Sequence, residues 1–95
     1  MADRPSVTVL VPSPLRDLTG GRACLELQAR TVDEAFDLIR HTEPLLAGRL
    51  FADDGQVRGF INVFVDGTEF RHLEDSRRAV SPGSVLAIVP SVAGG

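Results

Sequence analysis

Few side chains in this sequence are of the types that usually perform catalysis, and they are scattered along the chain. There is one cysteine, Cys24, and there are two histidines, His41 and His72. A catalytic thiol needs a positioned base, and no sequence feature places either histidine near Cys24. A single cysteine also excludes an internal disulfide and a metal site built from several cysteines. We therefore expect Cys24 to be a half-exposed strand residue, and we expect no metal site.

Two other stretches resemble ligand-binding loops but lack the residues that would bind. Gly20-Gly21 follows an apolar strand pattern, but Arg22-Ala23 stands where a phosphate-binding loop needs Lys-Ser or Lys-Thr. Asp53-Asp54-Gly55 contains two adjacent carboxylates, whereas a calcium loop needs spaced ligands and a distal Glu. We interpret the first stretch as a hairpin-like loop and the second as a solvated turn.

The remaining candidate for chemistry is the end of the chain. An apolar run over residues 85–89 leads directly into Pro90-Ser91-Val92-Ala93-Gly94-Gly95. A strand is therefore followed by a small-residue tail with a free carboxylate. Chain termini are often disordered, so a frayed end without function is the alternative interpretation. Our hypothesis is that the carboxylate of Gly95 is the functional group of the protein.

Composition and charge narrow the class of protein. Ninety-five residues, 43% of them hydrophobic, suit one domain with one core. The net charge of −3 gives no reason to expect nucleic acid or an anionic membrane as a partner. No apolar stretch approaches the roughly 20 residues that span a bilayer, and the first five residues do not resemble a signal peptide. We therefore expect a cytoplasmic protein. All ten basic residues are arginine, so no lysine side chain is present to accept an acyl group.

Alternation of apolar residues predicts the strands. Apolar residues alternate in 6–11 and in 23–28, which predicts two strands, and we expect these strands to form an antiparallel pair. Residues 60–65 form the strongest strand, and Asp66-Gly67 after it is a hairpin signal that leads into a return strand over 68–73. The last strand covers 85–89. Alternation places Ile61, Val63, Val65, Leu86 and Ile88 toward the core, and Phe60, Asn62, Phe64, Val85, Ala87 and Val89 on the other face.

One main helix is predicted between the second and third strands. Thr31 and Glu34 form a capping box, in which the Thr31 hydroxyl accepts from the Glu34 amide and the Glu34 carboxylate reaches back to the Thr31 amide. The helix continues to about His41, with Val32, Ala35, Phe36 and Ile39 on one buried face. A second short helical turn is expected from Pro44, with Leu45, Leu46 and Leu50 as its apolar anchors.

The order of strand, strand, helix and three further strands predicts a two-layer α+β domain. We place the long apolar last strand centrally, beside the first. The expected fold is a ubiquitin-like β-grasp, with a mixed sheet of four to five strands packed on one main helix. Its domain covers residues 1–90, and a flexible C-terminal Gly-Gly tail covers 91–95.

Several short motifs carry a resemblance to the MoaD/ThiS sulfur-carrier proteins. These are the Asp66-Gly67 hairpin, the Pro82-Gly83-Ser84-Val85 turn into the final strand, and the ending Pro90 to Gly95. Within that family the chain is most similar to the CysO-like branch, and the similarity covers nearly the whole chain. The motifs for this branch are Pro14-Leu15-Arg16, Thr19-Gly20-Gly21, Phe60-Ile61-Asn62-Val63 and Ile88-Val89-Pro90.

The resemblance implies a function for the tail. An E1-like adenylating and sulfurtransferase enzyme would use ATP to activate Gly95, and sulfur would replace an oxygen to give a thiocarboxylate. No cofactor would be bound by this chain. The sulfur-acceptor enzyme would be a PLP-dependent cysteine synthase, with a metallopeptidase trimming the product, or an enzyme that makes another sulfur-containing cofactor or natural product. Val92, Ala93, Gly94 and Gly95 would enter the active sites of these partners.

The rest of the chain would supply a docking surface, for which we expect Phe64, Ala87, Val89 and Pro90. Three alternatives stay open at this point. The chain could be a ubiquitin-like modifier conjugated through Gly95, the small subunit of molybdopterin synthase, or a non-covalent β-grasp binding module whose tail is incidental.

Overall fold

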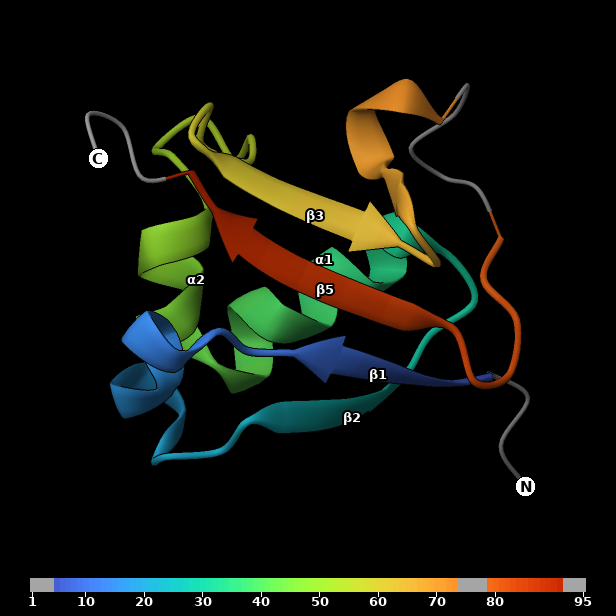
Figure 1. Ribbon diagram of the computed structural model, residues 1–95, viewed down its shortest axis with the longest axis horizontal. Helices are drawn as coiled ribbons and strands as arrows, with labels where there is room; N and C mark the ends of the chain where they lie inside the picture. The colour runs from blue at the N-terminus through green and yellow to red at the C-terminus, as the bar shows by residue number, and fades with distance from the viewer. Residues whose placement is uncertain (1–4, 74–78, 92–95) are drawn as a thin grey trace.

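Five strands form one mixed sheet in the computed structural model, which describes residues 5–73 and 79–91. The sheet order is β2-β1-β5-β3-β4, and β5 runs parallel to β1 while the other neighbours are antiparallel. Figure 1 shows α1 and α2 behind this sheet, so no helix in the described ranges covers the opposite face, which we call the open face. The elements in chain order are β1 (Ser6–Leu10), η1 (Ser13–Thr19), β2 (Cys24–Gln28), α1 (Val32–Thr42), α2 (Pro44–Leu50), β3 (Ile61–Val65), β4 (Thr68–Glu69), η2 (Phe70–His72) and β5 (Val85–Pro90).

The expected α+β sheet and the central position of the last strand are both confirmed. The first pair also has the predicted direction, with Val7 opposite Leu27 and Val9 opposite Leu25. Its connection is not the simple hairpin-like loop that we expected, because it contains the seven-residue 3-10 helix η1. The prolines of this stretch fix φ and favour such a turn at a helix start. Gly20 then ends η1 with φ of 68° and Gly21 follows with φ of 87°, both left-handed values that suit glycine.

Helix α1 begins at the predicted cap, with one difference in the capping box. The Thr31 hydroxyl accepts from the Glu34 amide at 3.0 Å, as expected. The Glu34 carboxylate reaches one residue further than predicted and accepts from the Arg30 amide at 2.8 Å. The Thr31 backbone instead forms an isolated antiparallel bridge with Ala79. At this bridge the Val80 amide donates to the Arg30 carbonyl at 2.9 Å, so both main-chain groups of Arg30 are bonded at the start of the helix.

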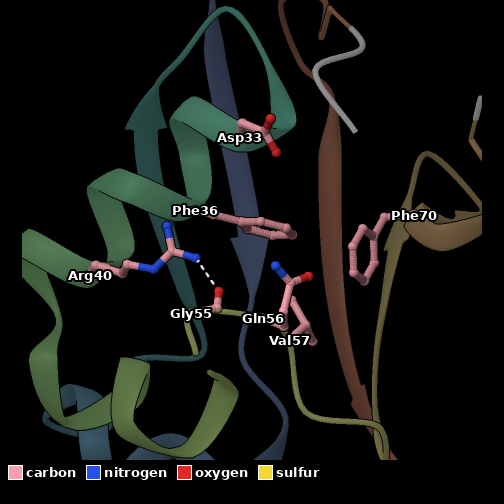
Figure 2. Close-up of a pocket in the computed structure, with 7 residues that line it drawn as sticks. All are labelled: Asp33, Phe36, Arg40, Gly55, Gln56, Val57 and Phe70. Carbon is pink, nitrogen blue, oxygen red and sulfur yellow. Dashed lines mark hydrogen bonds between the residues drawn. The ribbon is translucent and has the colours of Figure 1, made fainter. Parts of the chain in front are cut away.

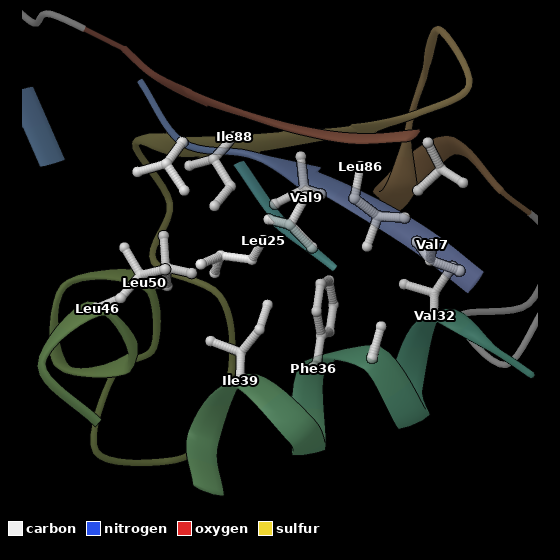
Figure 3. Close-up of a cluster of buried hydrophobic side chains, with 14 of the residues drawn as sticks. Val7, Val9, Leu25, Val32, Phe36, Ile39, Leu46, Leu50, Leu86 and Ile88 are labelled. Carbon is white, nitrogen blue, oxygen red and sulfur yellow. The ribbon is translucent and has the colours of Figure 1, made fainter. Parts of the chain in front are cut away.

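The core lies between α1, α2 and the sheet (Figure 3). The four predicted α1 residues are all buried, and Phe36 is their largest side chain. The Phe36 ring makes edge contacts with Phe51 at 5.6 Å and with Phe70 at 5.3 Å between ring centroids. The predicted return strand over 68–73 is wrong beyond Glu69, since Phe70 lies in η2. Because Phe70 packs on the helix side of the sheet, it does not cover Phe64.

Helix α2 is longer than the single turn that we expected, and one of its predicted anchors is misplaced. Leu46 and Leu50 are buried, with 0% and 2% of their surfaces exposed. Leu45 is 67% exposed. Residues 46 and 50 are four apart and share one face of a helix, whereas residue 45 lies about 100° away from 46.

We predict that Leu46→Ala lowers the free energy of unfolding by about 2–5 kcal/mol, because it removes buried methyl groups and leaves a cavity. Leu45→Ala is the matched control on the same helix and should change stability by about 0.5 kcal/mol or less. Urea unfolding of both variants measures the difference. Equal losses would show that α2 packs in a different rotation from the one described here.

Candidate functional site

Most of the residues that we expected to dock partners lie on the open face of the sheet, where they form a continuous apolar surface. One row of directly paired residues crosses all five strands on this face: Cys24, Leu10, Ala87, Phe64 and Glu69. In a second row, Val89 lies opposite Asn62. Neighbours across a sheet on one face are close enough for side chains to touch. The expected residues Phe64, Ala87 and Val89 are therefore brought together by the tertiary structure.

We call Leu10, Phe64, Ala87 and Val89 the open-face patch. Leu10 is 43% exposed and Val89 is 41% exposed, while Phe64 and Ala87 are half-buried. Leu10 was not among the predicted docking residues, although its place between the inward Val9 and Val11 was a signal that it faces outward. Its side chain joins the patch only because β1 and β5 are neighbours, with Leu10 opposite Ala87.

Carboxylate side chains border the open-face patch toward both edges of the sheet, on β2 and on β4. On β2, the Glu26 carboxylate accepts from the Ser6 hydroxyl at 3.1 Å and the Thr8 hydroxyl at 3.4 Å. On β4, the Glu69 carboxylate lies 2.9 Å from a guanidinium nitrogen of Arg71. An apolar centre with a polar rim is the usual anatomy of a protein interface.

The predicted Asp66-Gly67 turn fixes where β5 begins. Asp66 has φ of 50° and Gly67 has φ of 93°, as a two-residue hairpin requires. The Asp66 carboxylate accepts from the Val85 amide and from the Ser84 hydroxyl, both at 2.9 Å. Because a register shift of one residue would turn every β5 side chain to the other face, this carboxylate helps to hold Ala87 and Val89 outward.

Pro90 stands apart from the open-face patch. It pairs with buried Ile61, so alternation places it on the side of the sheet opposite Val89. It lines a groove of about 330 Å³ at the end of β5, next to α2. We call this groove the tail-root groove; its lining residues are Pro14, Leu15, Arg49, Phe60, Ile61, Pro90 and Ser91.

The last described part of the chain is bonded to this end of the sheet. The Ser91 amide donates to the Phe60 carbonyl at 2.7 Å, which continues the β3–β5 pairing by one bond beyond Pro90. The predicted tail residues Val92, Ala93, Gly94 and Gly95 lie outside the described residues. The structure thus describes the point from which the tail starts and the surface beside it.

A second depression lies on the helix side of the molecule (Figure 2). It has a volume of about 230 Å³, and Phe36 and Phe70 form its apolar part. Arg40 lies at its edge, where it donates to the Gly55 carbonyl and to Asp37, both at 2.7 Å. These bonds occupy Arg40 in holding the fold, so the depression offers no evident set of groups for a ligand.

Within residues 5–73 and 79–91, no cluster of three or more His, Cys, Asp or Glu side chains is arranged to hold a metal ion. Cys24 is exposed at the edge of the sheet, as its place in the alternating strand predicted. No helix in the described ranges combines the length and apolar character needed to cross a membrane. The surface features that stand out are the open-face patch and the start of the tail beside it.

Comparisons with known proteins agree with this arrangement. The chain matches the ThiS family over residues 9–95. It is 27% identical over 92 residues to the sulfur carrier protein CysO of Mycobacterium tuberculosis, covering 95% of this chain and 99% of that protein. That relative is named as a carrier and not as an enzyme.

Two solved structures show the same fold. A chain in the crystal structure of the Amycolatopsis orientalis BexX/CysO complex has a TM-score of 0.81 and 35% identity, covering 94% of this chain and 99% of that one. The small archaeal modifier protein SAMP1 of Haloferax volcanii has a TM-score of 0.78 and 28% identity, covering 95% and 99%. The chain therefore belongs to the ThiS family, as a CysO-like member with the ubiquitin-like β-grasp fold of the sulfur carriers.

Proposed function

We propose that the carboxylate of Gly95 is adenylated by an activating enzyme and converted to a thiocarboxylate, which then donates its sulfur to a biosynthetic acceptor. The observation that carries this proposal is the match to the ThiS family, which continues to residue 95. The structure adds the central strand β5, which ends beside an exposed apolar patch. In this proposal the chain is a protein co-substrate, and catalysis belongs to its partners.

The chemistry follows from the poor reactivity of a carboxylate, whose leaving group would be oxide. A Gly95 carboxylate oxygen attacks the α-phosphate of ATP, and pyrophosphate leaves. Sulfide then attacks the acyl carbon of the adenylate, and AMP leaves with that oxygen. Where the donor is an enzyme persulfide, the same attack gives an acyl disulfide, and a second thiol of the donor enzyme cleaves its S–S bond, so that the donor keeps a disulfide and the inner sulfur stays on Gly95. Gly95 ends as a thiocarboxylate, whose sulfur is nucleophilic. Glycines at the end of the tail suit a narrow active-site channel, since they carry no side chain that could clash.

The open-face patch is the proposed docking surface for these partners. The BexX/CysO complex shows that a protein similar to this chain assembles with a partner. For this chain we propose an E1-like activating enzyme and a sulfur-acceptor enzyme, such as a PLP-dependent cysteine synthase with a metallopeptidase downstream. Leu10, Ala87, Phe64 and Val89 would provide the apolar centre of the contact. Pro90 and the tail-root groove would contact the partner where the tail enters it.

A protein modifier is the second candidate function. It is favoured by the similarity to SAMP1, which is named a modifier protein. Conjugation would use the same adenylate, but a lysine amine of another protein would displace AMP and form an isopeptide bond. Peptides with Gly-Gly remnants on target lysines would identify this function. A small subunit of molybdopterin synthase would carry sulfur by the same tail chemistry as the proposed carrier. Only the identity of the sulfur acceptor would distinguish the two roles.

We predict that the purified chain, incubated with its activating enzyme, ATP and a sulfur source, gains the mass of an oxygen-to-sulfur exchange at its C-terminus. Intact-protein mass spectrometry followed by fragmentation locates the change at Gly95. The matched control adds one alanine after Gly95. It should fold normally, because a terminal addition buries little surface, and it should not be loaded. Loading of the extended chain, or no loading with any activating enzyme encoded nearby, contradicts the proposal.

We also predict that Val89→Asp weakens binding to the activating enzyme at least tenfold, because it places a charge in the desolvated centre of the contact. Leu45→Asp is the matched control, since it charges an equally apolar and more exposed residue on α2, away from the open face. It should leave the affinity within about twofold. Titration calorimetry measures both. Equal affinity of the Val89 variant and the native chain would exclude the open-face patch as the interface.

A further inference from the structure

One arginine outside the open-face patch holds the backbone to which the start of the tail is bonded. We infer that Arg71 is a positioning residue for Gly95: by fixing the segment 57–61, it sets the direction in which the chain leaves the sheet. This inference rests on the proposed function, because positioning matters only if Gly95 is activated. Arg71 itself touches no reacting atom.

The Arg71 guanidinium bonds to three main-chain carbonyls of one short segment. Its Nη1 donates to the Ile61 carbonyl at 3.1 Å, and its Nη2 donates to those of Val57 at 3.2 Å and Arg58 at 2.9 Å. Only arginine has enough donors in a planar fork to reach several acceptors at once. One side chain therefore ties the start of β3 to Val57 and Arg58, in addition to the main-chain bonds from the Ile61 amide to the Arg58 carbonyl and from the Arg58 amide to the Leu50 carbonyl.

Arg71 is itself held in place on two sides. The Glu69 carboxylate accepts from Arg71 Nη1 and from the Arg71 amide, both at 2.9 Å. The Phe70 ring lies under the guanidinium, with 4.8 Å from the guanidinium carbon to the ring centroid. These contacts restrict the rotamer of Arg71 and so reduce the entropy that its carbonyl bonds would otherwise cost.

The segment 57–61, to which Arg71 bonds, contains the hydrogen-bond acceptor of the Ser91 amide. Phe60 stands between Arg58 and Ile61, whose carbonyls Arg71 binds, and the Phe60 carbonyl accepts from the Ser91 amide at 2.7 Å. The Phe60 side chain cannot fix this carbonyl by burial, since it is 57% exposed. The Arg71 bonds to the carbonyls of Arg58 and Ile61, together with the β3–β5 pairing, hold the backbone on both sides of the Phe60 carbonyl.

The consequence lies in the residues that follow Ser91. Four residues span at most about 14 Å, so the position at which Ser91 is held on the sheet limits where Gly95 can reach. A misplacement of about 1 Å at a reacting group can cost a large factor in rate. Loss of the Arg71 bonds should therefore reduce the rate at which the docked carrier is activated. The open-face patch should be unchanged, and so should the affinity for the activating enzyme.

Hydrogen exchange of two backbone amides tests the structural step. In Arg71→Ala, exchange of the Ser91 amide should accelerate about tenfold or more, since the carbonyls of Arg58 and Ile61, on either side of its acceptor, lose their charge-assisted bonds. The Asp66 amide, bonded to the Val85 carbonyl at the other end of the β3–β5 pair, should exchange as before. Arg71→Lys keeps the charge but not the fork, and should accelerate Ser91 as well. Unchanged Ser91 exchange in both variants overturns the inference, as does equal acceleration at Asp66, which would indicate a global loss of stability.

Arg40→Ala is the matched control. Arg40 also donates to a loop carbonyl, pairs with an acidic side chain and lies over a ring, that of Phe51, but its hydrogen bonds go to Gly55 and Asp37 and not to residues 57–61. Its loss should leave Ser91 exchange within about twofold of the native rate, after correction for any change at Asp66.

ATP–pyrophosphate exchange by the activating enzyme tests the functional step. For Arg71→Ala, kcat should fall about tenfold while the KM for the carrier stays within about twofold, and Arg40→Ala should change neither. Faster Ser91 exchange with an unchanged kcat would overturn the positioning role. If even the native chain is not adenylated, the proposed function fails and the positioning role fails with it. The Ser91 data alone still decide whether Arg71 fixes the chain end.

Discussion

The structure depends on the insertion of β5 between β1 and β3. This strand makes a parallel pair on one side and an antiparallel pair on the other, and thereby joins two hairpin-like units that are far apart in the sequence. Leu86 and Ile88 are buried on its helix side, with 1% and 4% exposure. Without this strand the sheet would divide into two separate pieces, neither with enough buried surface for an independent core.

The same strand serves the fold and the candidate site because successive strand residues point to opposite faces. Its inward residues close the core, its outward residues form the centre of the open-face patch, and its end carries Ser91. A partner docked on the patch is consequently adjacent to the start of the tail. No rearrangement of the core would be needed to bring the open-face patch close to Ser91, the last described residue.

Arginine side chains bond main-chain carbonyls in the connections and within helices and strands. Arg16, Arg22, Arg40, Arg58 and Arg71 each donate to at least one main-chain carbonyl. A lysine could satisfy one such carbonyl, but it has no planar fork to bridge several. In this lysine-free chain the basic residues therefore act as internal connectors as well as surface charges. Such bonds matter most in the 51–60 connection, which has an isolated bridge between Phe51 and Val57 but no strand of its own.

The sequence by itself determined the elements and their faces. Period-2 and period-3.6 patterns, the Thr31 cap and the Asp66-Gly67 turn are local properties, so the strands, the main helix, the buried residues of both and the outward faces of Phe64, Ala87 and Val89 could be read directly. Local patterns were insufficient where a residue's role depends on distant partners. Glu34 caps the Arg30 amide instead of the Thr31 amide, beside the pairing of Thr31 with Ala79, and Phe70 lies in η2, where it packs on Phe36 and not in the predicted strand. Three other features also depend on distant partners: Leu10 lies in the open-face patch, Pro90 lines the tail-root groove, and Arg71 bonds to carbonyls near Phe60. These contacts join residues that only the closed sheet brings together, so only the tertiary structure could decide them.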